Sequence, residues 1–399
     1  MSKKNMQPLY YVESIKQFEN NTTALLLYIP NNIDKWVNVN KDFRKCVKVR
    51  LTSDCLEAVR EGRYVYKINN NTYEIADNDY RVAQIRERNN RLIDNLTQNL
   101  TEAPRFLYDN VYSLCSYHIN VGHGNHSLLV FESNGRVHIW MIDCSDYDFT
   151  SHRYYRNNIN DCLAHIKHKF KLTDPIHIDV VMLTHPHYDH YSGISYYINT
   201  NMIDNRTVSY LNLRYKIVNH NFNNLLSQLN NLGVAIIEPF KHNSCDNIRI
   251  LYPDFHNFNN NLSLNNMSSV YNISFDKESY FVFPGDLETA GWNLMDVNEC
   301  CPYMTNPLYY AISHHGSING HHRNMFCLCR NAHINNIKDC LHKNTITVLM
   351  GRDKAFSGIY SQEVLNDFNG RILFSEKDNN NHISRFLEID LISKVTKWH

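Results

Sequence analysis

The chain has neither a charge excess of one sign nor a long hydrophobic run. Forty Lys and Arg residues balance forty Asp and Glu residues among the 399 residues. Without a global basic excess a protein does not hold polyanions non-specifically, so any nucleic-acid contact must be local. No stretch approaches the roughly 18 apolar residues that a membrane span needs, and no secretion signal is recognisable at the amino end. We therefore expect a soluble, cytoplasmic protein that makes no membrane contact.

The sequence also lacks internal repeats and Gly/Ser-rich or Pro-rich linkers, so domain boundaries must be inferred from the residue pattern alone. Its 11 cysteines are an odd number spread over a long chain. A reducing cytosol keeps such thiols reduced. We therefore interpret most of them as small buried hydrophobic residues and not as a disulfide framework.

Two parts of the sequence differ in pattern, and we place the boundary at residue 108. Residues 1–108 combine short β-prone runs, split by Asn-rich turns, with one stretch of apolar residues at helical spacing. This pattern predicts a separate N-terminal α+β module. Its predicted strands and helix are residues 24–29, 46–51, 64–68 and 81–100.

The role of this module stays open, because its residues fit substrate recognition, a protein partner or a dimer contact equally well. Strand alternation places Arg44, Lys48 and Arg50 on one face. That face could contact phosphates. We favour a face exposed to water, because charged side chains are usually outside.

Residues 109–399 show compact strands that alternate with helical patterns. Such a series is typical of two sheets covered on the outside by helices, so we expect an α/β layered sandwich. The predicted strands are residues 128–132, 137–142, 177–183, 208–211, 235–237, 247–251, 280–283, 309–312, 345–349 and 371–374. The predicted helices are residues 160–170, 222–232, 287–295 and 362–368.

A histidine-rich motif directly follows the predicted strand 177–183. Residues 184–190 read Thr-His-Pro-His-Tyr-Asp-His and place three imidazoles and a carboxylate within six residues. At a strand end, His185 and His187 would share one side of an extended loop, and a turn into a helix would present Asp189 and His190 nearby. Burying these groups is costly unless a cation compensates them, so the motif predicts two adjacent metal positions.

This motif resembles the His-x-His-x-Asp-His signature of the metallo-β-lactamase fold superfamily, which lies at the mouth of an αββα sandwich. Two later segments agree in order and strand context. The strand 280–283 leads into Gly-Asp at Asp286, where the family has its bridging carboxylate. The strand 309–312 leads into Ser-His-His-Gly-Ser, where the family has its last histidine, His315. The resemblance implies a metal-dependent hydrolase.

The expected cofactors are two divalent metal ions. Nitrogen-rich ligation with carboxylates favours zinc, and manganese and iron stay open. A hydroxide bridging the two ions would be the nucleophile, because two cations lower the pKa of bound water toward neutrality. One ion would take His185, His187 and Asp286, and the other Asp189, His190, His315 and the shared Asp286.

More narrowly, the His-His-Gly-Ser ending is similar to the branch that contains the hydrolase domain of the ComEC-type DNA-uptake channel and the phosphorylcholine esterases. Residues 120–127 resemble its opening Asp-Val-Gly-Gln-Gly-Asp-Ser hairpin, and residues 359–365 and 372–374 resemble its terminal helix and strand. The likeness spans about residues 115–391. This resemblance implies that His314 donates to the leaving oxygen and that Glu288 touches a metal or the substrate. Support of neighbouring ligands is the alternative for both. The candidate catalytic residues are Asp189, Glu288 and His314.

Several residues carry open alternatives. His123 and His126 could reach the metals or brace the hairpin, and we favour the hairpin, because polar residues beside glycines usually serve a turn. Asp143 is expected to brace the first histidine loop. The family's additional histidine in a Gly-His-Ser/Thr context is missing, and His220 lies in an Asn-rich stretch where we favour solvation.

A second group of cysteines and histidines could hold a structural zinc. Its spacing fits none of the compact zinc patterns, so we favour no site there. The group consists of Cys300, Cys301, His321, His322, Cys327, Cys329 and His333.

Three functions fit these residues. The branch resemblance favours a phosphodiesterase or nuclease that acts on nucleic acid or a nucleotide-like substrate. A small-molecule esterase or lactonase with the same metals is the second. The third is a non-catalytic metal-binding module, which we disfavour because decay normally removes ligands and the expected set is present.

Overall fold

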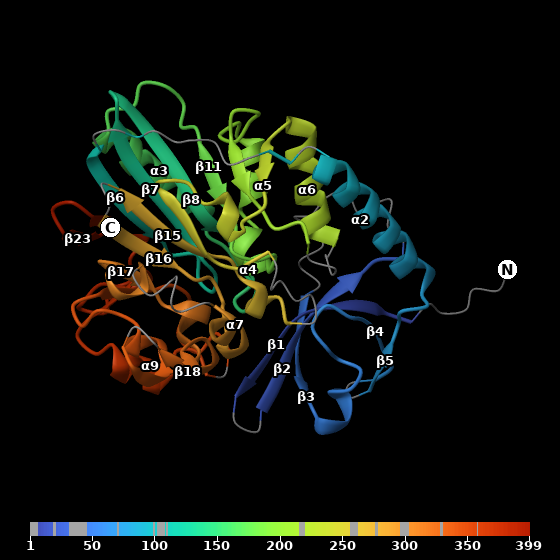
Figure 1. Ribbon diagram of the computed structural model, residues 1–399. Helices are drawn as coiled ribbons and strands as arrows, with labels where there is room; N and C mark the ends of the chain where they lie inside the picture. Colours follow the sequence, from blue (N-terminus) through green and yellow to red (C-terminus); the bar gives the residue numbers. More distant parts are fainter. Residues whose placement is uncertain are drawn as a thin grey trace. The chain divides into compact units, whose positions relative to one another are not determined.

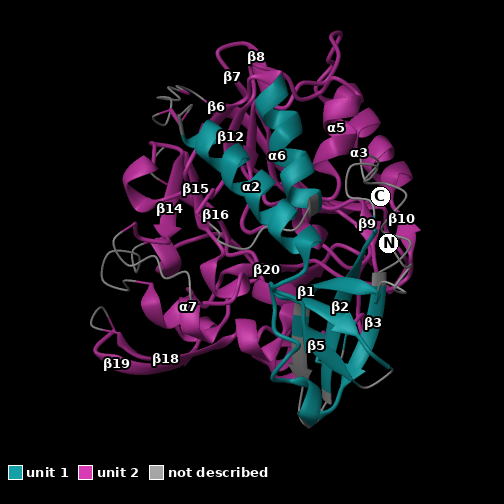
Figure 2. Cartoon of the chain, turned by 90° about the vertical axis from the view of Figure 1, so that its right-hand side faces the viewer, with its two compact units in different colours: residues 1–99, 215–231, 356–358 teal, residues 100–214, 232–355, 359–399 magenta. Residues whose placement is uncertain are grey.

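The computed structural model describes residues 7–18, 21–31, 46–69, 72–98, 100–101, 108, 111–214, 220–255, 262–275, 278–295, 303–327, 330–356 and 358–399. The chain forms two compact units (Figure 2). Unit 1 comprises residues 1–99, 215–231 and 356–358, and unit 2 comprises residues 100–214, 232–355 and 359–399. The predicted division into domains at residue 108 stays a prediction.

Unit 1 contains a five-stranded antiparallel sheet in the order β3-β2-β1-β4-β5. Val12, Leu26 and Val65 are buried in its core. The exposed Lys48 and Arg50 agree with the solvated face that we favoured, and Arg44 lies outside the described residues. The elements are β1 (Leu9–Phe18), β2 (Asn21–Ile29), β3 (Cys46–Leu51), β4 (Tyr64–Lys67), β5 (Tyr73–Ile75), η2 (Ser53–Cys55), α2 (Tyr80–Gln98) and most of α6 (His220–Leu232).

The first sheet of unit 2 has eight strands in the order β13-β12-β11-β8-β7-β6-β22-β23. Figure 1 labels β6, β7, β8 and β11 of this sheet. The four strands β8, β11, β12 and β13 are parallel to one another, and the others pair antiparallel. The strands are β6 (Val111–Ile119), β7 (His126–Ser133), β8 (Arg136–Cys144), β11 (Val180–Met182), β12 (Val208–Tyr210), β13 (Ala235–Ile237), β22 (Phe386–Asp390) and β23 (Val395–Trp398).

The second sheet has six strands in the order β14-β15-β16-β17-β20-β21. Its strands β16, β17, β20 and β21 are again parallel. Each sheet therefore has a parallel half whose strands all end at the same edge. The strands are β14 (Ile248–Tyr252), β15 (Val270–Phe275), β16 (Glu278–Phe283), β17 (Tyr309–Ala311), β20 (Ile346–Leu349) and β21 (Ile372–Phe374).

Strand alternation explains why the two sheets pack face to face. Phe281 and Phe283 of β16 join Trp140 of β8 in one apolar core, which draws on both sheets. Val282, between the two phenylalanines, points the other way and packs with Trp292 of α7 in an outer core. Successive side chains of the strand are thus buried on opposite faces, so both faces of the sheet are covered.

Helices cover the outer faces, so unit 2 is an αββα sandwich, the architecture of the metallo-β-lactamase fold. The predicted fold class is confirmed. Among the described residues no helix is both long and apolar enough to cross a membrane. The helices are α3 (Arg156–Lys169), α4 (Tyr188–Tyr191), α5 (Ile194–Asn199), α7 (Thr289–Leu294) and α9 (Gln362–Asp367). Short elements complete the unit: β9 (Tyr147–Asp148), β10 (Arg153–Tyr154), β18 (His322–Cys327), β19 (Ala332–Asn336), η3 (Lys241–Asn243), η4 (Asn265–Met267), η5 (Ser313–Gly316), η6 (Ile318–Gly320) and η7 (Ile337–Asp339).

Candidate metal centre

The candidate site residues follow the ends of parallel strands in both sheets. The histidine loop 184–190 follows β11, and Asp143 lies at the end of the neighbouring parallel strand β8. Asp286 follows β16, and the pair 314–315 follows the parallel strand β17. Because the carboxyl ends of parallel strands meet at one edge of a sheet, each sheet delivers its polar residues to a single place.

Asp143 fixes the start of the histidine loop. Its Oδ1 accepts a hydrogen bond from the backbone N–H of Thr184 at 2.8 Å, and its Oδ2 accepts one from the Thr184 hydroxyl at 2.9 Å. The ring Nδ1 of His190 lies 2.8 Å from the same Oδ2. With Nδ1 held by the carboxylate, Nε2 of His190 is oriented away from Asp143 as a ligand atom. The prediction that Asp143 braces this loop is confirmed.

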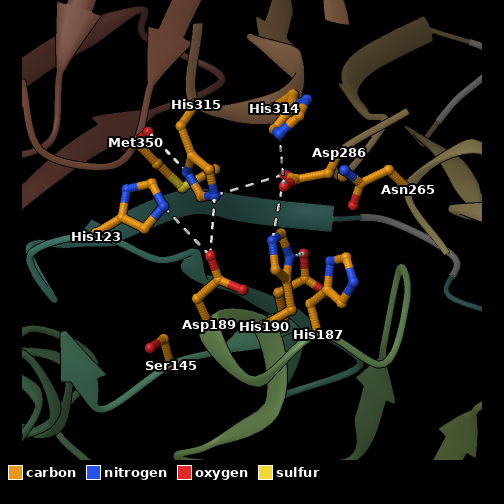
Figure 3. Close-up of polar contacts among 12 residues, drawn as sticks. His123, Ser145, His187, Asp189, His190, Asn265, Asp286, His314, His315 and Met350 are labelled. Atoms are coloured by element: carbon orange, nitrogen blue, oxygen red, sulfur yellow. Dashed lines mark hydrogen bonds and ion pairs between the residues drawn. The ribbon is translucent and has the colours of Figure 1, made fainter. Parts of the chain in front are cut away.

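The Gly-Asp turn after β16 lies against the histidine loop. A Cβ added to Gly285, whose φ is +59°, would come within 2.5 Å of the Thr184 side chain, so the close approach requires glycine. The approach leaves Asp286 Oδ1 3.2 Å from Nε2 of His190. The predicted convergence of these two distant segments is therefore observed (Figure 3).

The two histidines after β17 face the same place from the second sheet. Both have a left-handed backbone, with φ of 50° at His314 and 49° at His315. The Ser313 hydroxyl donates to the carbonyl oxygens of Gly285 and Leu287 at 3.1 and 2.7 Å, which ties this turn to the Gly-Asp turn. Nε2 of His315 lies 3.5 Å from Oδ1 of Asp286.

His314 forms a dyad with Glu288. Nδ1 of His314 lies 3.2 Å from Oε1 of Glu288, and its Nε2 lies 3.7 Å from Oδ2 of Asp286. The side-chain amides of Asn265 and Asn266 each donate to one oxygen of Glu288 at 3.1 Å. These two asparagines could not be singled out from the sequence, because about one residue in seven of the chain is Asn.

His123 enters the site from the hairpin between β6 and β7. Its Nε2 lies 3.5 Å from Oδ2 of Asp189, and Nε2 of His315 lies 3.5 Å from the same oxygen. Asp189 is thus grouped with His123 and His315, an arrangement that our assignment of ligands to two ions did not include.

The other open histidines differ from His123. Both ring nitrogens of His126 have partners, at 2.9 Å to the carbonyl oxygen of Ser145 and at 3.0 Å to the hydroxyl of Tyr197. His126 therefore braces the hairpin. His220 begins α6 in unit 1, but its side chain lies outside the described residues.

Nearly all of these groups are buried. His185, His190 and Asp286 are each 0% exposed. Burial lowers the pKa of His185 well below its usual value, which favours the neutral, ligand-competent imidazole. Burial alone would raise the pKa of Asp286. The imidazoles of His315, His190 and His314 instead hold it well below the usual range, so Asp286 is an anion.

The donor set fits divalent metal ions. Two ligands of one ion, each at about 2.0–2.2 Å, are separated by roughly 3–4.3 Å, and the observed 3.2 and 3.5 Å fall in that range. In each group the ligand atoms lie within 4.8 Å of one another. The groups at this edge are His185, His187 and Asp286; His190, Asp286 and His315; and His123, Asp189 and His315.

Comparisons with known proteins give only distant likenesses. No protein-family model matches the chain, and no curated protein matches it. A crystal structure of a diphosphatase from the PhnP family is 12% identical, with a TM-score of 0.35, and the match covers 69% of this chain and 98% of that one. A long-form RNase Z from yeast is 13% identical, with a TM-score of 0.33, and the match covers 71% of this chain and 42% of that one. Likeness at this level carries no argument about activity.

Proposed function

We propose that the chain is a hydrolase with a dinuclear metal centre. His185, His187 and Asp286 would hold one ion, and Asp189, His190, His315 and Asp286 the other. The observation that carries the proposal is the place of Asp286, which belongs to two ligand groups at once. A carboxylate shared in this way is suited to bridging two cations.

Two divalent cations bound here would supply Lewis acidity, which activates water near neutral pH and stabilises charge on a phosphoryl or acyl oxygen. Zinc suits the mixture of imidazoles and carboxylates best. The chain's residues orient these groups, because Asp143 fixes the His190 ring and the carbonyl oxygen of Met350 lies 3.3 Å from Nδ1 of His315.

The dyad of His314 and Glu288 supplies the proton for the leaving group. Oε1 of Glu288 lies beside Nδ1 of His314, so this carboxylate orients the ring and directs Nε2 toward Asp286. The 3.7 Å between Nε2 and Asp286 is too long for a good hydrogen bond. Nε2 is therefore placed to donate to a substrate oxygen held beside Asp286.

The substrate that we propose is a phosphodiester, either nucleic acid or a nucleotide-like molecule. The support is the resemblance of the His-His-Gly-Ser ending and the opening hairpin to the branch that contains the DNA-uptake channel. Alkoxide leaving groups of phosphodiesters need protonation, which the His314–Glu288 dyad provides. The zero net charge predicts that such binding is not driven by a general affinity for polyanions.

A substrate panel tests the proposal. The purified chain is assayed with bis(p-nitrophenyl) phosphate, single- and double-stranded DNA, RNA and a lactone, each with and without added Zn²⁺ or Mn²⁺. Metal-dependent cleavage of a phosphodiester, absent in Asp286→Ala, is the expected result. Rapid lactone turnover without phosphodiester cleavage would favour the small-molecule esterase or lactonase. If the purified chain binds less than one metal ion and turns over none of these substrates, a module without catalysis would be favoured.

A further inference from the structure

We propose that His123 is a metal ligand that acts together with Asp189 and His315. The inference rests on the proposed dinuclear centre and deepens it, because it adds His123 to the ion that Asp189 and His315 would hold. The hairpin that carries His123 resembles one with glutamine at this position. The ligand would therefore be a feature of this chain.

The spacing of the three side chains fits one shared ion. Their ligand atoms lie within 4.8 Å of one another, and Nε2 of His123 and of His315 are each 3.5 Å from Oδ2 of Asp189. A hydrogen bond between a ring N–H and a carboxylate is normally 2.7–3.2 Å long. The two observed separations are longer than this by about 0.3 Å or more. Two ligands of one ion are roughly 3–4.3 Å apart. The separations thus match an ion between the groups better than direct hydrogen bonds (Figure 3).

The hairpin holds His123 in this position. The backbone N–H of Asn125 donates to the carbonyl oxygen of Asp189 at 3.0 Å, which joins the hairpin to the histidine loop. A Cβ at Gly124, whose φ is +155°, would come within 2.8 Å of that same carbonyl oxygen and within 2.7 Å of Ser145. Glycine therefore permits the close approach, and the approach brings the His123 ring to 4.3 Å from the His315 ring, measured between centroids.

The burial of His123 distinguishes it from a polar residue whose role is only to form the turn. Its side chain is 1% exposed, whereas a polar turn residue is usually in water. His126, three residues on, is also buried and shows what a bracing histidine does, since both of its ring nitrogens bond to groups of the surrounding fold. His123 faces the Asp189 carboxylate and the His315 imidazole, which we assign to an ion.

The proposal makes the two metal positions unequal. Among the residues that the structure describes, the ion beside His185 and His187 would have these two residues and Asp286 as protein ligands. The other ion would have the imidazole of His123 as an additional ligand, so this position would have more protein ligands than the first. The second position should therefore bind its ion more tightly than the first.

Metal titration tests this without relying on activity. The full-length chain is freed of metal with a chelator and titrated with Zn²⁺ and Co²⁺, with metal content measured by mass spectrometry and the Co²⁺ absorption spectrum recorded. In His123→Ala we expect the affinity for the more tightly bound of the two ions to fall at least about tenfold, as it does when a residue that supports a metal ligand is removed. The Co²⁺ absorption of that ion should intensify, because absorption strengthens as the coordination number falls. The control is His382→Ala, which removes a histidine whose side chain is 78% exposed and should change neither property.

Thermal unfolding in chelator shows whether His123→Ala folds normally, and His123→Gln is measured beside it as a milder change. The inference about His123 would be overturned if the wild-type chain binds two ions and both variants keep its metal affinities and its Co²⁺ spectrum. A higher KM for substrate in the variants would not rescue it, and the proposed function would still stand. Less than one ion in the wild-type chain would overturn the proposed function and this inference together.

Discussion

Two regions of unit 2 are rich in histidine, but only one of them gathers its side chains. In the metal centre, defined as residues 185–190, 286 and 314–315, the ligand atoms converge within a few ångströms. The histidine hairpin, defined as β18, β19 and the adjoining residue 321, has a similar local density of His and Cys. Its described residues take part in no group of three that could hold an ion.

Topology explains the difference. In the centre, parallel strands of two sheets end at one edge, so residues far apart in sequence meet. In the hairpin, antiparallel alternation exposes His322 and His333 and buries Cys327. His321 is used locally, with Nε2 at 2.8 Å from Asp367 of α9. Local composition is therefore a weaker guide to a metal site than strand ends are. Cys300, Cys301 and Cys329 lie outside the described residues.

The largest expected effect comes from Asp286→Ala. It removes the carboxylate shared by two ligand groups, so both ions should be lost. Hydrolysis should fall at least about 10³-fold, the scale of losing the main electrostatic stabilisation of the transition state. Metal content per chain, measured by mass spectrometry, checks the first part. A variant that kept two ions would show that Asp286 is not the bridge.

His314→Ala should separate chemistry from metal binding. We expect both ions to remain and turnover to fall roughly 10²–10⁴-fold, as for the loss of a general acid. Glu288→Gln should lower turnover less, because the ring keeps a hydrogen-bond partner. His315→Ala is the matched change, and it should lose metal. If His314→Ala lost metal and His315→Ala did not, the roles of the two histidines would be exchanged.

Asp143→Asn probes the support of the centre. Asp143 holds Thr184 and the His190 ring, and losing such a partner typically costs about 10- to 100-fold in metal affinity. Competition with a chelating dye measures the change. An affinity equal to that of the wild-type chain would mean that the loop is positioned without this carboxylate.

His118 shows how a buried histidine without a carboxylate partner behaves. Its ring nitrogens lie 2.9 and 3.1 Å from the hydroxyls of Ser127 and Ser116, and burial lowers its pKa to about 3. The unfolded chain binds this proton near pH 6.5, so the stability contributed by the neutral ring is present above that pH and is lost as pH falls toward 3. From pH 8 to pH 5 we expect a loss of about 2 kcal/mol from this residue.

Denaturant unfolding of the chelated wild-type chain and of His118→Gln at both pH values measures that contribution. The variant should be less stable at pH 8 and should lose about 2 kcal/mol less on acidification. An identical pH dependence in the two proteins would refute the assignment to His118.

The smallest effect is expected in the histidine hairpin. His322 is exposed and 3.3 Å from Glu363, an exposed ion pair worth little. His322→Ala and His333→Ala should therefore keep the metal content and the turnover of the wild-type chain. Loss of one ion in either variant would show that the hairpin holds metal after all.

The sequence predicted much of unit 2 because its strands are short apolar runs. Each of the ten predicted strands of residues 109–399 overlaps an observed strand, and the order of the motifs showed which strand ends carry polar groups. The sequence did not predict strands β6, β9, β10, β15, β18, β19, β22 and β23. The pairing of β22 with β6, which joins Phe386 to Ile119, depends on contacts between distant segments that no local pattern reveals.

Within the site, the limits were of a different kind. Spacing along the chain placed Asp189 beside His190, and the structure shows in addition that Asp189 lies near His123, which comes from another hairpin. The support of Glu288 by Asn265 and Asn266 was hidden by the abundance of asparagine. Residue types and strand ends could be predicted, whereas side-chain partners across separate loops required the structure.

The most direct test of the central claim, that residues from both sheets bind two neighbouring metal ions, is anomalous scattering at the zinc absorption edge. The crystal is grown from protein purified without chelator. We predict two neighbouring peaks, one beside His185, His187 and Asp286 and the other beside His190, Asp286 and His315. No peak at this edge of the sheets, or a single peak elsewhere in the molecule, would contradict the dinuclear centre.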